Sequence, residues 1–592
     1  MKFSARKSAQ RCAGCFVLCL FCFPSNCSAV EPVDEFTALV DEMWEFVLQE
    51  DPLFATATGD HRYDDRLPAV RLADHQRRHD AKVEFLRRLD AIERDALDTD
   101  NRVNYDILRR QLTDNLTEYD FGAQLMPINQ RSGFHVEFPE LPRDVPLDSV
   151  ADYENYLARL RAFGQYADEN ISLMREGLAS ERVLPAVAWE GWQKAVDAQI
   201  TDDPEQHLLY KPLRKLPTGI PESEHDRLRA AAREAISTSV VPGYRRFRQF
   251  MEEEYVPGSR DSVGISAVLG GRDFYRFCVR KFTTLELTPE EVHQIGLAEV
   301  ARIQAEMDQI IRDVQFDGDF AAFTKFLRED PQFYAESSEQ LLKEVALVLK
   351  KMDGQLPTLI GKLPRQPYGL REVPDYIAPR TTAAYYQPPT GDGTKAGFFY
   401  MNTYNLKSRP LFTIEALSFH EAVPGHHLQI ALQMELEGLP QFRRFTNFTA
   451  FVEGWALYAE RLGRELGFYQ EPYSDFGRLT LEMWRACRLV VDTGIHYYGW
   501  TRQQAIDYLL QHTALSLHDI SSEVDRYITW PGQALAYKIG EMKIRELRAK
   551  AEERLGERFD LREFHDVVLG SGAVPLDVLE ANVEAWLDSH VE

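Results

Sequence analysis

The sequence predicts a mainly α protein, a large helical body that carries a small β-sheet. Two observations point to this fold class. Helical periodicity dominates most of the 592 residues, whereas proline, glycine and tyrosine gather in one region, 355–396. Hydrophobic residues make up 44% of the chain, which is enough for the core that such a body needs.

Most of the predicted helices follow from residue spacing, and two also carry start signals. Thr288 and Glu291 form a capping box around Pro289, and apolar residues then recur at steps of three and four. Thr501 and Gln504 begin another helix in the same way. Further helices are expected at 36–50, 71–96, 150–177, 222–254 and 534–554.

The best strand candidate is the aromatic run at 397–404, directly after the proline-rich region. No repeat of fixed period and no low-complexity linker divides the chain. We therefore expect one continuous body after a signal peptide at 1–29. A soft boundary would separate an N-terminal helical half, 30–354, from a C-terminal half, 355–592, that carries the metal site.

The first 29 residues have the pattern of a secretory signal. Basic residues precede an apolar run at 12–23, which is too short to span a bilayer, and Pro24 ends the run. Cys27 and Ala29 provide small residues at −3 and −1 of a cleavage site before Val30. No cysteine here fits a Leu-x-Gly/Ala-Cys lipoprotein box. We expect an exported protein, periplasmic or extracellular, without lipoprotein anchoring.

Charge and hydropathy argue against nucleic-acid binding and against an integral membrane protein. The formal net charge of −25 repels phosphate backbones, so nucleic-acid binding is not expected. No stretch after residue 30 approaches 18 consecutive apolar residues, so no integral membrane span is expected either. The oligomeric state stays open.

The stretch HEAVPGHH at 420–427 is the most informative part of the sequence. Zinc hydrolases usually hold the metal with both histidines of HExxH, which share a helical face, and the glutamate takes a proton from water. Here Pro424 stands in the place of the second histidine, and it breaks the helix because it lacks an N–H. Together with Gly425 it permits a two-residue bulge. The predicted site residues are His420 and His426 as metal ligands and Glu421 as general base, with His427 as the alternative ligand or as a group behind the site.

A third ligand is expected from Glu453, in the stretch FVEGWA that opens a later helix. A return loop and a second helix make its spacing from His426 suitable for reaching the same ion. Two histidines and one carboxylate suit one zinc ion and leave a fourth position open for water. The alternative for Glu453 is a carboxylate that only stabilises a helix N-terminus.

Two further stretches could complete the site. In the run 526–540, Tyr537 could donate its hydroxyl to an oxyanion, with Tyr527 as the second choice and a core role as the alternative for both. Arg485, Arg488, Asp492 and His496 follow one another at steps of three or four on one helical side, so they could line the site or form a buried ionic network.

The motifs at 420–429 (HEAVPGHHLQ), 451–456 (FVEGWA), 491–496 (VDTGIH) and 531–540 (PGQALAYKIG) resemble the bacterial family catalogued as domain of unknown function 885. The similarity covers about 35–590. That family in turn resembles, more distantly, gluzincin-type zinc peptidases such as Taq-type carboxypeptidases and thimet oligopeptidase. This resemblance implies a zincin-like helical fold with a deep cleft.

The resemblance also implies roles for single residues. His420, His426 and Glu453 match the ligands of those peptidases, Glu421 matches their general base, and Tyr537 matches their oxyanion tyrosine. The strand around Tyr400 would be an edge strand that binds an extended peptide. Candidate cations for a substrate carboxylate are Arg526, Lys538, Arg380 and Arg488.

These observations together predict a zinc-dependent metallopeptidase that acts on short peptides. Two alternatives stay open at this point. The protein could be a non-catalytic envelope protein that binds a metal or peptides, because Pro424-Gly425 departs from HExxH. It could also be a zinc hydrolase of non-peptide amide or ester bonds.

Overall fold

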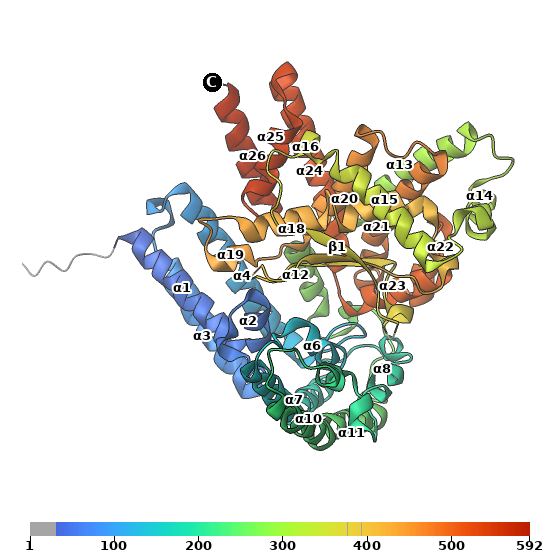
Figure 1. Cartoon of the computed structure of the whole chain (residues 1–592). Helices are drawn as coiled ribbons and strands as arrows, with labels where there is room; N and C mark the ends of the chain where they lie inside the picture. The colour runs from blue at the N-terminus through green and yellow to red at the C-terminus, as the bar shows by residue number, and fades with distance from the viewer. Residues whose placement is uncertain (1–30, 376, 392, 592) are drawn as a thin grey trace, which may run out of the picture.

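The computed structural model describes residues 31–375, 377–391 and 393–591, and the fold is mainly α (Figure 1). The predicted signal peptide at 1–29 lies outside these residues. The division of the remaining chain at 354/355 stays a prediction. No described helix is long and apolar enough to cross a membrane.

The predicted helices are present, with small shifts at their ends. Both capping boxes are formed, at Thr288 before α13 and at Thr501 before α22. The longer helices of the first half are α1 (Pro32–Glu50), α3 (Leu72–Asp90), α4 (Thr99–Phe121), α7 (Val150–Ala179), α10 (Glu222–Ala235), α11 (Val241–Phe250), α12 (Gly271–Thr283), α13 (Pro289–Asp313), α14 (Phe320–Glu329) and α15 (Ser338–Asp353). Those of the second half are α17 (Ile414–Glu421), α18 (His426–Glu435), α20 (Thr449–Glu465), α21 (Pro472–His496), α22 (Arg502–His512), α23 (Leu517–Thr529), α24 (Ala536–Leu555), α25 (Leu561–Gly570) and α26 (Leu576–Val591).

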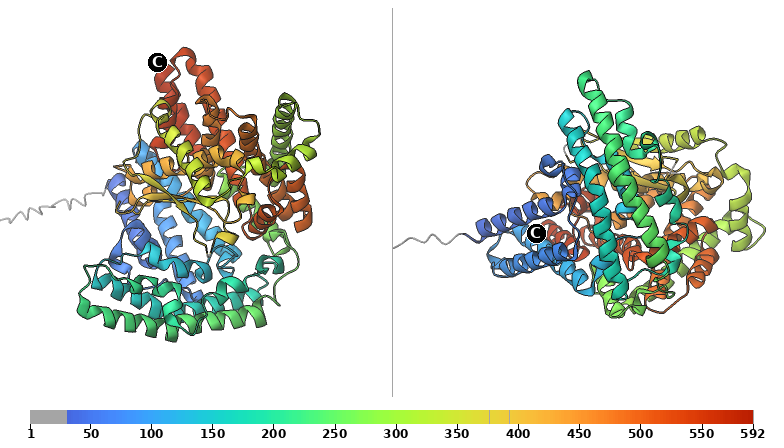
Figure 2. Two further views of the ribbon diagram at one scale, coloured as in Figure 1. Left: turned by 45° about the vertical axis from the view of Figure 1, so that its right-hand side comes forward. Right: turned by 90° about the horizontal axis from the view of Figure 1, so that it is seen from below.

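The helices pack in distinct layers. Figure 2 shows α7, α10 and α11 side by side at one end of the molecule, where they share a hydrophobic core of their own. The tips of α25 and α26 stand at the opposite end. A second core joins α1, α3 and α4 to the helices of the C-terminal half, including α17, α18, α20 and α24. The segment that carries the predicted ligands therefore lies in the part of the core that both halves build.

The proline-rich region supplies a small sheet of three strands in the order β1-β3-β2. These are β1 (Tyr368–Glu372), β2 (Ala384–Gln387) and β3 (Gly397–Met401). β3 pairs in parallel with β1 and antiparallel with β2. The expectation that the strand around Tyr400 lies at an edge is therefore wrong. Its backbone is paired on both sides, because the turns within 355–396 supply a neighbouring strand for each of its edges.

Candidate metal site

The site begins where the helix of the HEAVPGHH stretch breaks. α17 ends at Glu421 and α18 begins at His426, with a cis Val423–Pro424 peptide between them. Gly425 passes directly over the end of α17, so a Cβ there would lie 2.0 Å from the carbonyl oxygen of His420. Only glycine fits this approach. The two-residue bulge expected from Pro424 and Gly425 is a full break between two helices.

A tryptophan of the second motif fixes this break to α20. The indole Nε1 of Trp455 donates to the carbonyl of Pro424 at 2.8 Å, and Trp455 is fully buried. Glu453 lies two residues earlier on the same helix. The hydrogen bond therefore sets the position of His426 relative to Glu453, which gives the FVEGWA motif a physical role beyond its carboxylate.

The structure brings His420, His426 and Glu453 to one point. Oε2 of Glu453 lies 3.5 Å from Nε2 of His420 and 3.4 Å from Nε2 of His426. All three ligand atoms lie within 4.8 Å of one another, and the two imidazole rings are nearly perpendicular at 82°. Ligand atoms about 2.0–2.1 Å from a tetrahedral zinc lie about 3.4 Å apart. The two carboxylate–imidazole distances match that spacing.

The electrostatics of the three side chains depend strongly on one another. Burial lowers the pKa of His420, but its contacts with the carboxylates of Glu453 and Glu460 outweigh this effect and raise the pKa to about 9. Burial raises the pKa of Glu453, but the two imidazoles hold that pKa well below its usual range. Oε2 of Glu453 is buried without a hydrogen-bond partner within the described residues. These groups thus form a concentrated donor set that a cation would satisfy.

Glu460 orients the first histidine and was not predicted. Its Oε1 lies 2.8 Å from Nδ1 of His420, which leaves Nε2 as the atom that faces Glu453. Metal-binding histidines commonly hold a carboxylate on their other nitrogen in this way. Glu460 lies seven residues, about two helical turns, after Glu453, so the face of α20 that carries the ligand also carries its support. That spacing is the signal from which Glu460 could have been found.

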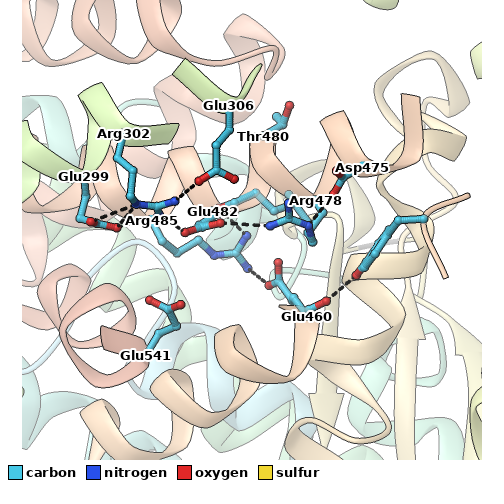
Figure 3. Close-up of polar contacts among 12 residues, drawn as sticks. Glu299, Arg302, Glu306, Glu460, Asp475, Arg478, Thr480, Glu482, Arg485 and Glu541 are labelled. Atoms are coloured by element: carbon cyan, nitrogen blue, oxygen red, sulfur yellow. Dashed lines mark hydrogen bonds and ion pairs between the residues drawn. The ribbon is translucent and has the colours of Figure 1, made fainter. Parts of the chain in front are cut away.

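A buried ionic cluster on α21 stands behind Glu460. Figure 3 shows Arg485 reaching Glu460, with Nη2 and Oε1 3.5 Å apart, and Arg302 and Arg478 converging on Glu482. The ammonium of Lys538 is also buried in this cluster, within 3.0 Å of carboxylate oxygens from Glu299, Glu482 and Glu541. Lys538 is therefore occupied and does not offer its charge to a ligand.

Glu421 lies directly after His420 at the end of α17. Its side chain is 9% exposed, and it makes no hydrogen bond or ion pair with another described residue. The three histidines of the motif each make such a contact, His420 with Glu460, His426 with Glu453 and His427 with Tyr386. The carboxylate of Glu421 therefore has no partner among the described residues, and it follows the ligand candidate His420 directly in the chain.

Two glycines bring the fourth motif against the second. A Cβ on Gly454 would lie 2.5 Å from the backbone of Gly540, and one on Gly540 would lie 1.8 Å from the carbonyl oxygen of Ala450. α20 and α24 therefore cross with their backbones in contact. Tyr537 lies one turn before Gly540 on α24, which places it on the part of that helix next to the ligand-bearing turn of α20.

A chain of side chains holds Tyr537. Its hydroxyl accepts from Nε2 of Gln533 at 3.4 Å, and the guanidinium of Arg488 lies 4.2 Å from its ring centroid. Gln533 in turn accepts from Nη1 of Arg526 at 2.7 Å, and Arg526 pairs with Glu523 at 3.0 Å. Arg526, predicted to bind substrate, is thus tied into this chain and positions Tyr537 through Gln533. Sequence reasoning did not find Gln533, although its spacing of four residues from Tyr537 indicates a shared helical face.

The remaining predicted residues lie in different surroundings. Tyr527 is 1% exposed and accepts from Trp484 and Arg488, so it braces Arg488 inside the core instead of contacting a ligand. Tyr400 stacks on Tyr385 and lines a cavity beside the sheet. The ring of His427 points to Tyr386, with 2.8 Å between Nδ1 and the hydroxyl. His426, not His427, is therefore the histidine that faces Glu453.

Asp492 and His496 belong to the core. Asp492 accepts from Tyr275 at 2.6 Å and from the backbone N–H of Gly532. His496 lies between the N–H of Ile265 and the carbonyl of Tyr527. Asp492 and His496 therefore belong to a buried polar network and do not line the candidate site.

Residues 52–583 match the family model "Bacterial protein of unknown function (DUF885)". A solved structure described as a "putative lipoprotein" from Colwellia psychrerythraea is similar, with 30% identity and a TM-score of 0.90, over 95% of this chain and 100% of that one. Another, described as a "putative lipoprotein of unknown function" from Shewanella oneidensis, shares the fold at 19% identity and a TM-score of 0.68, over 93% and 99% of the two chains. No curated protein matches.

Proposed function

Since the chain belongs to the DUF885 family of bacterial proteins of unknown function, we propose from its site that it is an exported zinc-dependent metallopeptidase that hydrolyses short peptides. His420, His426 and Glu453 would hold the zinc ion. Glu421 would act as general base, and Tyr537 would stabilise the oxyanion.

The spacing of the ligand atoms carries this proposal. Separations of 3.4 and 3.5 Å between Glu453 and the two imidazoles suit a tetrahedral ion, and the buried Oε2 has no hydrogen bond that such an ion would have to displace. A zinc ion held there would act as a Lewis acid toward the substrate carbonyl. The more distant resemblance to gluzincin peptidases supports the same assignment of residues.

The protein's own residues then divide the proton transfers. Glu421 accepts a proton from the attacking water and passes it to the leaving amine nitrogen. The hydroxyl of Tyr537 donates a hydrogen bond to the carbonyl oxygen as negative charge develops on it. Gln533 and Arg526 hold that hydroxyl in place.

Export is supported by the segment 1–29 and by the description of both similar solved proteins as lipoproteins. The intact mass of the exported chain tests this part of the proposal. Cleavage before Val30 predicts an unmodified N-terminus. A mass that includes a lipid-bearing cysteine would show instead that the protein is a lipoprotein, and that it is not cleaved before Val30.

Glu421→Gln tests the chemistry, because it keeps the shape of the side chain and removes its basicity. We expect one zinc per chain and cleavage of a mixed peptide library by the wild-type protein, with cleavage at least a hundredfold slower in Glu421→Gln at unchanged metal content. His427→Gln is the matched control and should keep both metal and cleavage. Full metal with no cleavage of peptides by the wild type would favour the binding-protein alternative. Cleavage of esters or non-peptide amides alone would favour the third alternative.

A further inference from the structure

A cavity of about 820 Å³ lies beside the candidate metal site and has no assigned role. Its walls come from α2 (Pro52–Thr58), α6 (Leu141–Asp144), β3, α18 and α19 (Gln441–Arg444), so both halves of the chain contribute. Much of its lining is apolar and aromatic. The side chains that provide this surface are Phe54, Phe398, Tyr400, Ile430, Met434 and Phe445.

The position of the cavity ties it to the ligand residues. Ile430 lies four residues after His426 on α18, which is about 6 Å along the helix on the same face. Val452, on the other side, directly precedes Glu453. The cavity wall therefore includes residues within one helical turn of His426 along α18 and of Glu453 along α20.

Three cations at this cavity have no carboxylate partner within the described residues. Arg444 donates only to the carbonyl of Met434, at 2.9 Å from Nε, and its Nη1 makes no hydrogen bond. The guanidinium of Arg371 lies 3.4 Å from the ring centroid of Phe398 and donates only to the hydroxyl of Tyr400, at 3.4 Å. Lys395 donates to a backbone carbonyl at 3.2 Å.

This lack of partners is informative because the chain is acidic. With a net charge of −25, carboxylates that could pair with a surface arginine are plentiful. A fourth cation of the cavity, Arg143, does pair with Asp144 and Glu140. The three others bring positive charge to an apolar cavity, which favours a ligand that combines an anionic group with apolar side chains.

We propose that this cavity binds the carboxyl-terminal end of a peptide whose last side chains are apolar. Arg444 and Arg371 would bind the terminal carboxylate, for which guanidinium groups have the matching geometry. This inference rests on the proposed function and names its substrate class: peptides cleaved close to a free C-terminus. Arg526 and Lys538, two of the four cations first expected to bind a carboxylate, are already occupied by carboxylates of the chain.

Binding of dansyl-Phe-Phe with a free carboxylate, compared with its C-terminal amide, tests the proposal. Both are titrated by fluorescence into the Glu421→Gln protein, so that cleavage does not interfere. We expect the free acid to bind at least tenfold more tightly than the amide. Arg444→Gln and Arg371→Gln should each reduce this preference to threefold or less, and Arg444→Lys should restore part of it.

Arg182→Gln is the matched control. Arg182 also donates to a backbone carbonyl, that of Leu269, and lies over an aromatic ring, that of Phe121, but it does not line the cavity. Its variant should keep the full preference. Equal binding of acid and amide, or a preference that survives both arginine variants, would overturn the proposal.

The outcome is separable from that of the proposed function. If the acid binds preferentially and the arginine variants abolish this, but the wild type cleaves no peptide, the cavity assignment stands and the peptidase assignment fails. If the wild type cleaves acid and amide substrates equally well, the peptidase assignment stands and the cavity assignment fails.

Discussion

Replacing Glu460 by glutamine tests whether the site is built to hold a metal. Glu460 accepts at 2.8 Å from Nδ1 of His420, and it is 1% exposed. Loss of such a supporting carboxylate usually weakens metal affinity 10–100-fold, which corresponds to about 1.4–2.8 kcal/mol. We expect a decrease of this size for Glu460→Gln, with the overall fold retained.

Competition with a chromophoric zinc chelator measures the effect, and circular dichroism verifies the fold. Glu465→Gln is the control, because Glu465 lies on the same helix but pairs with Arg548 at a partly exposed site. It should leave zinc affinity unchanged. A zinc affinity of Glu460→Gln within threefold of the wild-type value would refute the reasoning.

Three further predictions follow from single contacts. Gly425→Ala places a Cβ 2.0 Å from the carbonyl oxygen of His420, so it should abolish zinc binding and destabilise the fold by about 1–3 kcal/mol. Gly570→Ala, whose Cβ meets open space, should change neither zinc binding nor stability. Zinc titration measures the first effect and thermal unfolding the second. Tyr537→Phe should lower kcat about 10²–10³-fold in a peptide-cleavage assay at unchanged zinc content. Burial raises the pKa of Asp492 to about 7, so the folded state keeps a proton that the unfolded state loses near pH 4, and stability should fall by up to roughly 4 kcal/mol as pH rises from 4 to 7. Asp492→Asn should remove this part of the pH dependence of thermal unfolding, and an unchanged profile would contradict the assignment.

The helices could be predicted because their signals are local. Capping boxes at Thr288 and Thr501 and the apolar spacing of α7 and α24 each lie within one element. The place of β3 in its sheet could not be predicted in the same way. Which strand is central depends on how the turns within 355–396 fold back, and the strand's own residues do not encode that.

In the candidate site, too, the features with local sequence signals could be predicted and the contacts between segments could not. His420, His426 and Glu453 were identifiable because a few residue types point to metal chemistry, and Pro424-Gly425 could be interpreted as a local break. Which groups hold these ligands in place depends on packing between helices. The indole of Trp455 on Pro424 and the guanidinium of Arg485 near Glu460 are contacts between different segments, which no spacing rule specifies.

A crystal grown with zinc and measured at the zinc absorption edge tests the central claim most directly. We expect one anomalous peak per chain, about 2 Å from Nε2 of His420, Nε2 of His426 and the Glu453 carboxylate. A peak elsewhere, or none at this point in a zinc-saturated crystal, would contradict it.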